Sequence, residues 1–117
     1  VVVKEALGSA GLTMASKSIG TDIVYAWENA VIGTMEPSQA VKIMYADEIA
    51  KASDASALIQ KKTAEYTALQ SSAAAAARRG YVDDIIKAAE TRQRVIAAFE
   101  MLFTKSEDRP SKKHGTV

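Results

Sequence analysis

The sequence has 117 residues, and its 15 basic and 14 acidic side chains give a formal net charge of +1 at pH 7. Hydrophobic residues make up 48% and charged residues 25% of it, a balance that indicates a folded protein and argues against a disordered chain. The near-neutral charge argues against a nucleic-acid partner, and the lack of cysteine excludes disulfides, cysteine-type zinc sites and a cysteine nucleophile.

The N-terminus shows neither a signal peptide nor a membrane span. Residues 1–3 are all valine, with no basic segment and no long apolar stretch around them. No window contains the ~20 apolar residues that cross a bilayer. We therefore expect a cytoplasmic protein without a membrane span. An opening inside an apolar strand pattern, without Met, also leads us to expect a piece of a longer protein.

Strands and small-residue turns are predicted for the first third of the sequence. The β-branched residues 1–3 predict a strand, and residues 8–11 predict a tight turn, followed by a short helix that Gly20 ends. Residues 22–27 and 30–35 predict a second and a third strand. Their continuous apolar runs are typical of strands buried on both faces, as in a parallel or mixed sheet.

Helices are predicted from Pro37 onward, because proline is favoured at the first helical position. Apolar residues at helical spacing predict a helix over residues 38–78 with a break near Ser53. Residues 73–77 are all alanine, which has the lowest helix cost and lets another backbone approach closely. The Arg-Arg-Gly sequence at residues 78–80 then ends the helix.

The last part of the chain predicts one more helix and a tail. Residues 81–86 predict a short connector or strand, residues 90–104 a helix with one apolar face, and residues 105–117 an irregular tail. Two or three strands are fewer than an average sheet contains, which again indicates a piece of a larger fold. The apolar faces of the helices exceed what such short strands cover, so we expect them to meet a partner.

The small residues Gly8, Ser9, Ala10 and Gly11 form the most informative segment for chemistry. A strand-to-helix turn without bulky side chains exposes backbone N–H groups at a helix start. Such groups stabilise an anion, or an oxyanion that forms during a reaction. A purely structural turn that needs close packing explains the same residues, and the sequence leaves both interpretations open.

Side chains that act as catalysts or metal ligands are few. His114 is the only histidine and lies in the polar tail. Asp83 and Asp84 are adjacent, and adjacent residues of a strand point to opposite faces. We therefore expect no shared metal ion and interpret the two residues as an acidic pair that leads a helix.

The second half of the chain resembles a known family. The run Arg79-Gly80-Tyr81-Val82-Asp83-Asp84-Ile85-Ile86, followed by Glu90-Thr91-Arg92, resembles the C-terminal signature of beta-type subunits of biotin-dependent acyl-CoA carboxyltransferases. The further matching residues are 75–77, 112–115, 4–14, 25–27, Ala30, Met35 and Ala40. The resemblance covers nearly the whole chain in the family's order and is most specific over residues 75–92.

This resemblance implies an α/β fold that is the C-terminal part of a crotonase-like (ClpP/crotonase) ββα fold, mostly helical in this portion. Residues 1–117 would be the C-terminal fragment of the second, biotin-side carboxyltransferase domain. The first domain, contributed by another subunit, holds the acyl-CoA in this family.

The resemblance also implies a reaction. It places the biotin oxyanion hole on the backbone N–H groups of Ser9 and Ala10, with Gly8 shaping the turn and Gly11 among the cofactor-binding residues. Two fixed N–H donors stabilise the charge on the biotin ureido oxygen without a titrating side chain. The implied activity is carboxylate transfer between carboxybiotin and an acyl-CoA, with propionyl- or methylmalonyl-CoA expected. Carboxylase, decarboxylase and transcarboxylase directions all stay open.

The implied partners are a biotin carboxyl carrier protein or domain, the rest of the carboxyltransferase subunit, and further copies in a homo-oligomer. Biotin is the implied cofactor and a CoA thioester the substrate. Three departures from the family pattern bear on activity and substrate: Ser9 replaces a usual Gly, Glu28 a usual Pro, and Glu36 and Gln39 replace small residues.

An alternative from another class is a non-catalytic interaction or scaffold domain that keeps the crotonase-like fold, which the altered glycine positions favour. A crotonase-like hydratase is a further alternative. It would need a pair of glutamates near the 8–11 turn, and the sequence has none there.

Overall fold

The computed structural model describes residues 1–14 and 16–108. Residues 105–108, at the start of the expected tail, form neither helix nor strand. The remainder of that tail, including His114 and the matched residues 112–115, lies outside the described residues.

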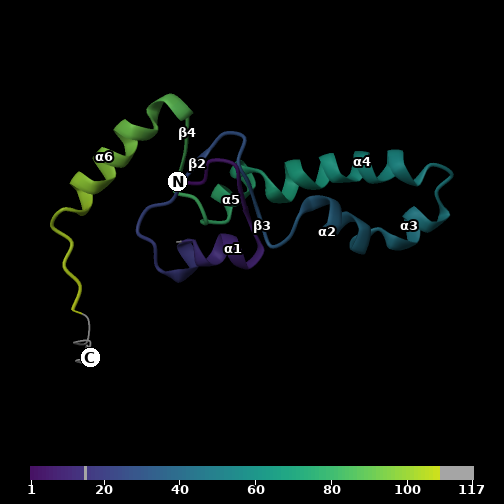
Figure 1. The fold of residues 1–117 in the computed structure, drawn as a ribbon, viewed down its shortest axis with the longest axis horizontal. Helices are drawn as coiled ribbons and strands as arrows, with labels where there is room; N and C mark the ends of the chain where they lie inside the picture. Colours follow the sequence, from purple (N-terminus) through teal and green to yellow (C-terminus); the bar gives the residue numbers. More distant parts are fainter. Residues whose placement is uncertain (15, 109–117) are drawn as a thin grey trace, which may run out of the picture.

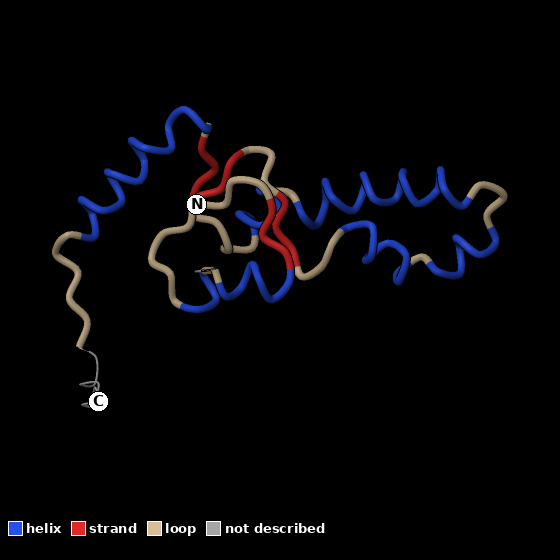
Figure 2. Tube along the Cα trace, in the orientation of Figure 1, coloured by secondary structure: helices blue, strands red, loops and turns tan. Residues whose placement is uncertain are grey.

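The strands form two parallel pairs, which confirms the parallel pairing expected from their apolar runs. Strand β1 (Glu5–Leu7) pairs with β3 (Val31–Gly33), and β2 (Tyr25–Trp27) pairs with β4 (Asp84–Ile86). Each strand has only three residues. Figure 2 shows both pairs in red at the centre of the molecule, with helices leading away from them.

The N-terminal segment connects the two pairs, so the first strand begins later than predicted. Val2 N–H donates to Tyr25 O at 2.7 Å, and Trp27 N–H donates to Val2 O at 2.9 Å, which makes an isolated bridge beside β2. At Lys4 the chain passes to the other pair, where Val31 N–H donates to Lys4 O at 2.8 Å. The start of β1 is therefore set by its pairing with β3, and not by the local β-propensity of residues 1–3.

The predicted helix over residues 38–78 is interrupted three times. The predicted break near Ser53 is confirmed, and further breaks occur at Tyr45 and Ser72. Two of the restarts are capped: Asp54 Oδ1 accepts from Ala57 N–H at 3.0 Å, and Ser72 Oγ accepts from Ala75 N–H at 3.2 Å. The segments are α2 (Pro37–Met44), α3 (Ala46–Lys51), α4 (Ala55–Tyr66), a π-helical segment (Thr67–Ser71) and α5 (Ala73–Arg78).

Two further α-helices stand outside this run. Helix α1 (Gly8–Thr13) follows β1 directly and ends earlier than predicted, with a separate 3₁₀ turn at Lys17–Ile19. Helix α6 (Thr91–Leu102) follows β4 after a second 3₁₀ turn at Ala88–Glu90. Within residues 1–14 and 16–108, no helix is long and apolar enough to cross a membrane.

The core is small and built largely from alanine. Its buried cluster consists of Val24, Ala26, Ala30, Ala73, Ala76 and Val82. Helix α5 supplies two of these alanines and lies against β3 and β4. The alanine run therefore lets a helix approach the strands closely, as the sequence predicted, and the chain turns away at Gly80 with φ at +79°.

The molecule is elongated, with a radius of gyration of 18.9 Å, against about 13 Å for a compact domain of this length. Helices α2, α3 and α4 extend from the strands as an arm, and α6 leaves on the opposite side (Figure 1). The Trp27 indole N–H donates to Thr91 Oγ1 at 2.9 Å and fixes the start of α6. Beyond that anchor, Phe99 in the helix and Phe103 just after it are exposed, by 71% and 87%.

Gly11 sets how closely α1 lies on β1. A Cβ at this position would lie 2.8 Å from the carbonyl carbon of Ala6 and 3.0 Å from its oxygen. No real side chain tolerates such distances to backbone atoms, so only glycine permits this contact between helix and strand.

The substitution Gly11→Ala should therefore destabilise the protein, because α1 must move away from β1. Overpacking costs about 1–3 kcal/mol, more than the ~1 kcal/mol that alanine gains over glycine in a helix. Thermal unfolding measures the effect. Gly33→Ala is a matched control, since its Cβ would meet the Ser71 hydroxyl at 3.3 Å and should cost less. Equal melting temperatures for wild type and Gly11→Ala would contradict the close contact.

The isolated 117-residue chain should self-associate. Its helices expose apolar side chains that the small core leaves uncovered, among them Ile43, Met44, Leu69 and Phe99. Sedimentation velocity should detect oligomers, and an apolar dye should bind the remaining surface. A monomer that binds no dye would contradict the expectation that these apolar faces pack against a partner.

Candidate functional site

Two strand-to-helix turns lie next to each other at one edge of the β1–β3 pair. The parallel register places Leu7 opposite Gly33, so both strands end at the same level. Strand β1 runs directly into α1, and β3 runs through a short loop into α2. Figure 2 shows the two red strands of this pair ending together before these helices. The arrangement brings two helix starts to one place.

Gly8 makes the first of these turns and contacts the second. Its φ is +59°, a backbone conformation that L side chains rarely adopt. A Cβ at Gly8 would lie 3.4 Å from Thr34 O, in the loop between β3 and α2. The turn is therefore tight and packed against its neighbour, which agrees with a shaping role for Gly8.

Ser9 and Ala10 occupy the first turn of α1, where N–H groups lack an acceptor within the helix. Both residues are exposed. No side chain caps α1, and among the described residues we find no acceptor for either N–H group outside the helix. The start of α2 differs, because Gln39 and Ala40 N–H donate to Glu36 O at 3.0 and 3.1 Å. The first turn of α1 thus presents donors to solvent.

Gly11 faces the other way. The direction of its missing side chain points into the backbone of Ala6, so the residue packs the helix on the strand. The segment from Gly8 to Gly11 thus combines both interpretations of the sequence, with close packing at Gly8 and Gly11 and exposed N–H groups at Ser9 and Ala10. The assignment of Gly11 to cofactor binding stays a prediction.

The residues that depart from the family pattern fall in different places. Glu36 is the N-cap of α2 and lies at the same strand edge as the α1 turn, where its Oε1 accepts from Ser38 Oγ at 2.6 Å. Gln39 follows on the first turn of α2 and is exposed. Glu28 lies in the turn between β2 and β3, outside the β1–β3 pair. Of the two glutamates among these departures, Glu36 therefore lies at the candidate site and Glu28 does not.

Asp83 and Asp84 point to different partners, as the strand geometry predicted. Asp83 accepts from Lys17 Nζ at 2.7 Å and from Val24 N–H at 2.7 Å, while Asp84 lies 3.4 Å from an Arg94 guanidinium nitrogen. The interpretation as a pair that leads a helix was wrong, because Asp84 belongs to β4. The described residues hold no cluster of three or more metal-ligating side chains.

Sequence reasoning missed the contact between Asp83 and Lys17. The two residues are 66 positions apart, and no local pattern connects them. The resemblance over residues 79–92 marked Asp83 as part of a specific motif without indicating its partner.

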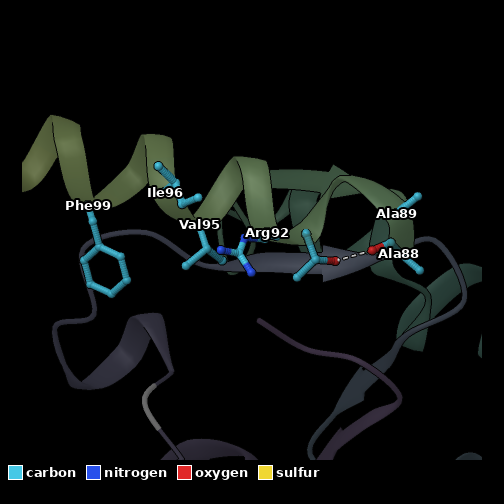
Figure 3. A pocket seen from close by; sticks show the side chains of 7 residues that line it. Ala88, Ala89, Arg92, Val95, Ile96 and Phe99 are labelled. Atoms are coloured by element: carbon cyan, nitrogen blue, oxygen red, sulfur yellow. Dashed lines mark hydrogen bonds between the residues drawn. The ribbon is translucent and has the colours of Figure 1, made fainter.

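A separate groove lies along α6, away from the α1 turn. It has a volume of about 590 Å³ and is lined by Ala88, Ala89, Thr91, Arg92, Val95, Ile96 and Phe99 (Figure 3). A neighbouring groove of about 440 Å³ continues the apolar surface to Phe103. Neither groove includes a residue of the α1 turn. We interpret this surface as a packing face, because its lining is mostly apolar and includes, among the described residues, Arg92 and Glu100 as the charged side chains.

Comparison with known proteins places the whole chain in one family. The family model described as carboxyl transferase domain matches residues 1–117. A putative propionyl-CoA carboxylase beta chain from Bacillus subtilis is 44% identical over 117 residues, which are 100% of this chain and 23% of that protein. The methylmalonyl-CoA decarboxylase subunit alpha of Propionigenium modestum is 43% identical over the same shares of the two chains.

A solved structure agrees with the sequence match. The crystal structure of transcarboxylase 12S, a hexamer with methylmalonyl-coenzyme A and methylmalonic acid bound, superposes with a TM-score of 0.86 at 38% identity. The match covers 97% of this chain and 22% of the transcarboxylase chain, so the chain spans under a quarter of the length of these relatives. The chain belongs to the carboxyl transferase domain family and has the crotonase-like α/β fold that the family resemblance implied.

Proposed function

We propose that the protein containing this chain transfers a carboxylate between carboxybiotin and an acyl-CoA. The observation that carries the proposal is the exposed, uncapped first turn of α1 at Ser9 and Ala10, within a chain that matches the carboxyl transferase family from end to end. Relatives named for propionyl-CoA and methylmalonyl-CoA support a short acyl group of this class. The direction of transfer stays open.

The residues of the turn fit the biotin ureido group. The segment lacks bulky side chains, Gly8 bends it at φ +59°, and no cap occupies the N–H groups of Ser9 and Ala10. When biotin, carried by another protein or domain, is bound, its ureido group would give up or take up the transferred carboxyl group. Ser9 and Ala10 N–H would donate to the ureido oxygen on which negative charge develops. The donors are fixed in advance, so they stabilise charge without reorganising.

The replacement of a usual glycine by Ser9 is compatible with this role. A serine side chain adds bulk at the turn but leaves its backbone N–H in place. No catalytic histidine, cysteine or acid is needed at the site, because backbone dipoles stabilise the charge.

The partners of this reaction would cover the exposed surfaces of the chain. We place a biotin carboxyl carrier protein or domain at the α1 turn, and the rest of the subunit and further copies against the apolar faces of the arm and of α6. A cytoplasmic location fits these partners. The alternative of a non-catalytic scaffold draws no support from relatives named for carboxylase, decarboxylase and carboxyltransferase activities.

The substitution Ala10→Pro should remove one donor from the oxyanion site. Loss of one such donor lowers kcat by about 10²–10³-fold, and Pro is tolerated in a first helical turn. Carboxylate transfer from biotin by the complete protein measures the effect. Ser56→Pro is the matched control, because it puts Pro into the first turn of α4 on the distant arm. A folded Ala10→Pro protein with a normal transfer rate would show that the Ala10 N–H takes no part in the reaction.

The isolated chain should bind no CoA at micromolar concentration. In the proposed arrangement the acyl-CoA lies on the first domain of another subunit, outside residues 1–117. Isothermal titration with CoA tests this. Tight binding to the isolated chain would place the acyl-CoA site here and count against the division of roles.

A further inference from the structure

We propose that Asp83 is a positioning residue for the α1 turn, because its carboxylate holds Lys17 and so fixes the segment that follows α1. We call the contact between these two side chains the Asp83–Lys17 clamp. The inference rests on the proposed function for its catalytic consequence, while the structural consequence can be measured separately.

The clamp joins distant parts of the chain. Lys17 Nζ donates to both oxygens of Asp83, at 2.8 and 2.7 Å, and also to the backbone oxygen of Asp22 at 2.8 Å. The three acceptors account for the three N–H donors of the ammonium group. Lys17 is therefore held in one place by groups that come from two different segments.

Asp83 is itself anchored to the core. Its Oδ2 accepts from Val24 N–H at 2.7 Å, and its own N–H donates to Val24 O at 2.8 Å. Val24 is buried within the core cluster and immediately precedes β2. The carboxylate thus transmits the position of the rigid core to Lys17.

Helix α1 depends on such an external anchor. It has six residues, none of them buried, and no side-chain cap. A helix this short is unstable by itself, so tertiary contacts must hold it. Gly11 fixes it on β1 from one side. The Asp83–Lys17 clamp supplies the second attachment, beyond its C-terminal end.

Backbone hydrogen bonds connect the clamp to the helix. Met14 N–H donates to Ala10 O at 3.1 Å, Ser16 N–H to Leu12 O at 3.5 Å, and Ile19 N–H to Ser16 O at 3.1 Å. This series runs from the first turn of α1 to the 3₁₀ turn that contains Lys17. A displacement of Lys17 would therefore move Ala10, whose N–H is a proposed oxyanion donor.

The charges around the clamp keep Asp83 ionised. The hydrogen bond from Lys17 and then that from Val24 N–H lower the pKa of the Asp83 carboxyl below its ordinary value of 3.8. The clamp is therefore intact above the ordinary carboxyl pKa and is lost only as the pH falls through the lowered one. The neighbouring carboxylates have their own cations, with Asp84 paired to Arg94 and Asp22 to Lys105.

Asp84 offers a matched control. It is the adjacent residue, has the same side chain and is exposed to a similar extent, 44% against 38% for Asp83. Its ion pair with Arg94 connects β4 to α6 and involves no atom of the Lys17 segment. A loss of charge at Asp84 should leave α1 in place.

The first test compares carboxylate transfer from biotin by the complete protein in wild type, Asp83→Asn, Asp83→Glu and Asp84→Asn. We expect Asp83→Asn to lower kcat about 10–100-fold, as a misplaced catalytic group does. KM for the acyl-CoA should not change, and Asp83→Glu should restore part of the rate. Asp84→Asn should behave as wild type. A normal kcat in Asp83→Asn, or an equal loss in Asp84→Asn, would overturn the proposal.

The second test does not depend on the reaction. Hydrogen exchange of the peptides covering α1 and residues 17–24 should accelerate in Asp83→Asn and not in Asp84→Asn. If the wild-type protein transfers no carboxylate, the proposed function is wrong. Hydrogen exchange in α1 still tests whether the Asp83–Lys17 clamp holds this helix. Unchanged exchange in α1 would overturn the positioning role.

A second variant covers the case in which Asp83→Asn does not fold. Lys17→Met removes the clamp and leaves the bonds between Asp83 and Val24 in place. It should lower kcat and speed exchange in α1 as Asp83→Asn does, with Lys17→Arg restoring part of both. A folded Lys17→Met protein with a normal kcat and normal hydrogen exchange in α1 would contradict the proposal.

Discussion

The parallel pairing of β1 with β3 is the constraint on which the rest of the structure depends. Because Leu7 and Gly33 end their strands side by side, both following helices start at the same edge. Gly8 turns the chain there, and Gly11 lets α1 lie directly on β1. Without that contact the first turn of α1 would have no fixed direction, and its N–H groups would lack the fixed geometry that the proposed donor role requires.

The small core explains why so much apolar surface stays open. Alanines on α5 pack closely on the strands but bury little area per residue, while several large side chains of the arm and of α6, such as Ile43, Met44 and Phe99, stay exposed. The chain spans under a quarter of the length of the relatives it matches.

The α1 turn is consequently held from two sides by different kinds of force. Gly11 lets the backbone of α1 contact the backbone of Ala6 directly, because it has no side chain. The Asp83–Lys17 clamp provides a charged hydrogen bond anchored on Val24. Rigid support of this kind would matter for the proposed backbone N–H donors, since such donors stabilise charge only when their geometry is fixed in advance.

The sequence by itself determined the features that rest on neighbouring residues: the helix-forming alanines, the Gly80 stop, the small-residue turn at residues 8–11 and the family signature around residues 79–92. The tertiary structure decided what depends on residues far apart. Strand β1 begins at Glu5, because Val31 N–H donates to Lys4 O and Glu5 pairs with Val31. Asp83 contacts Lys17 only in the folded chain. Local propensity and spacing encode torsion angles and faces, whereas pairing across 66 positions exists only once the chain has folded.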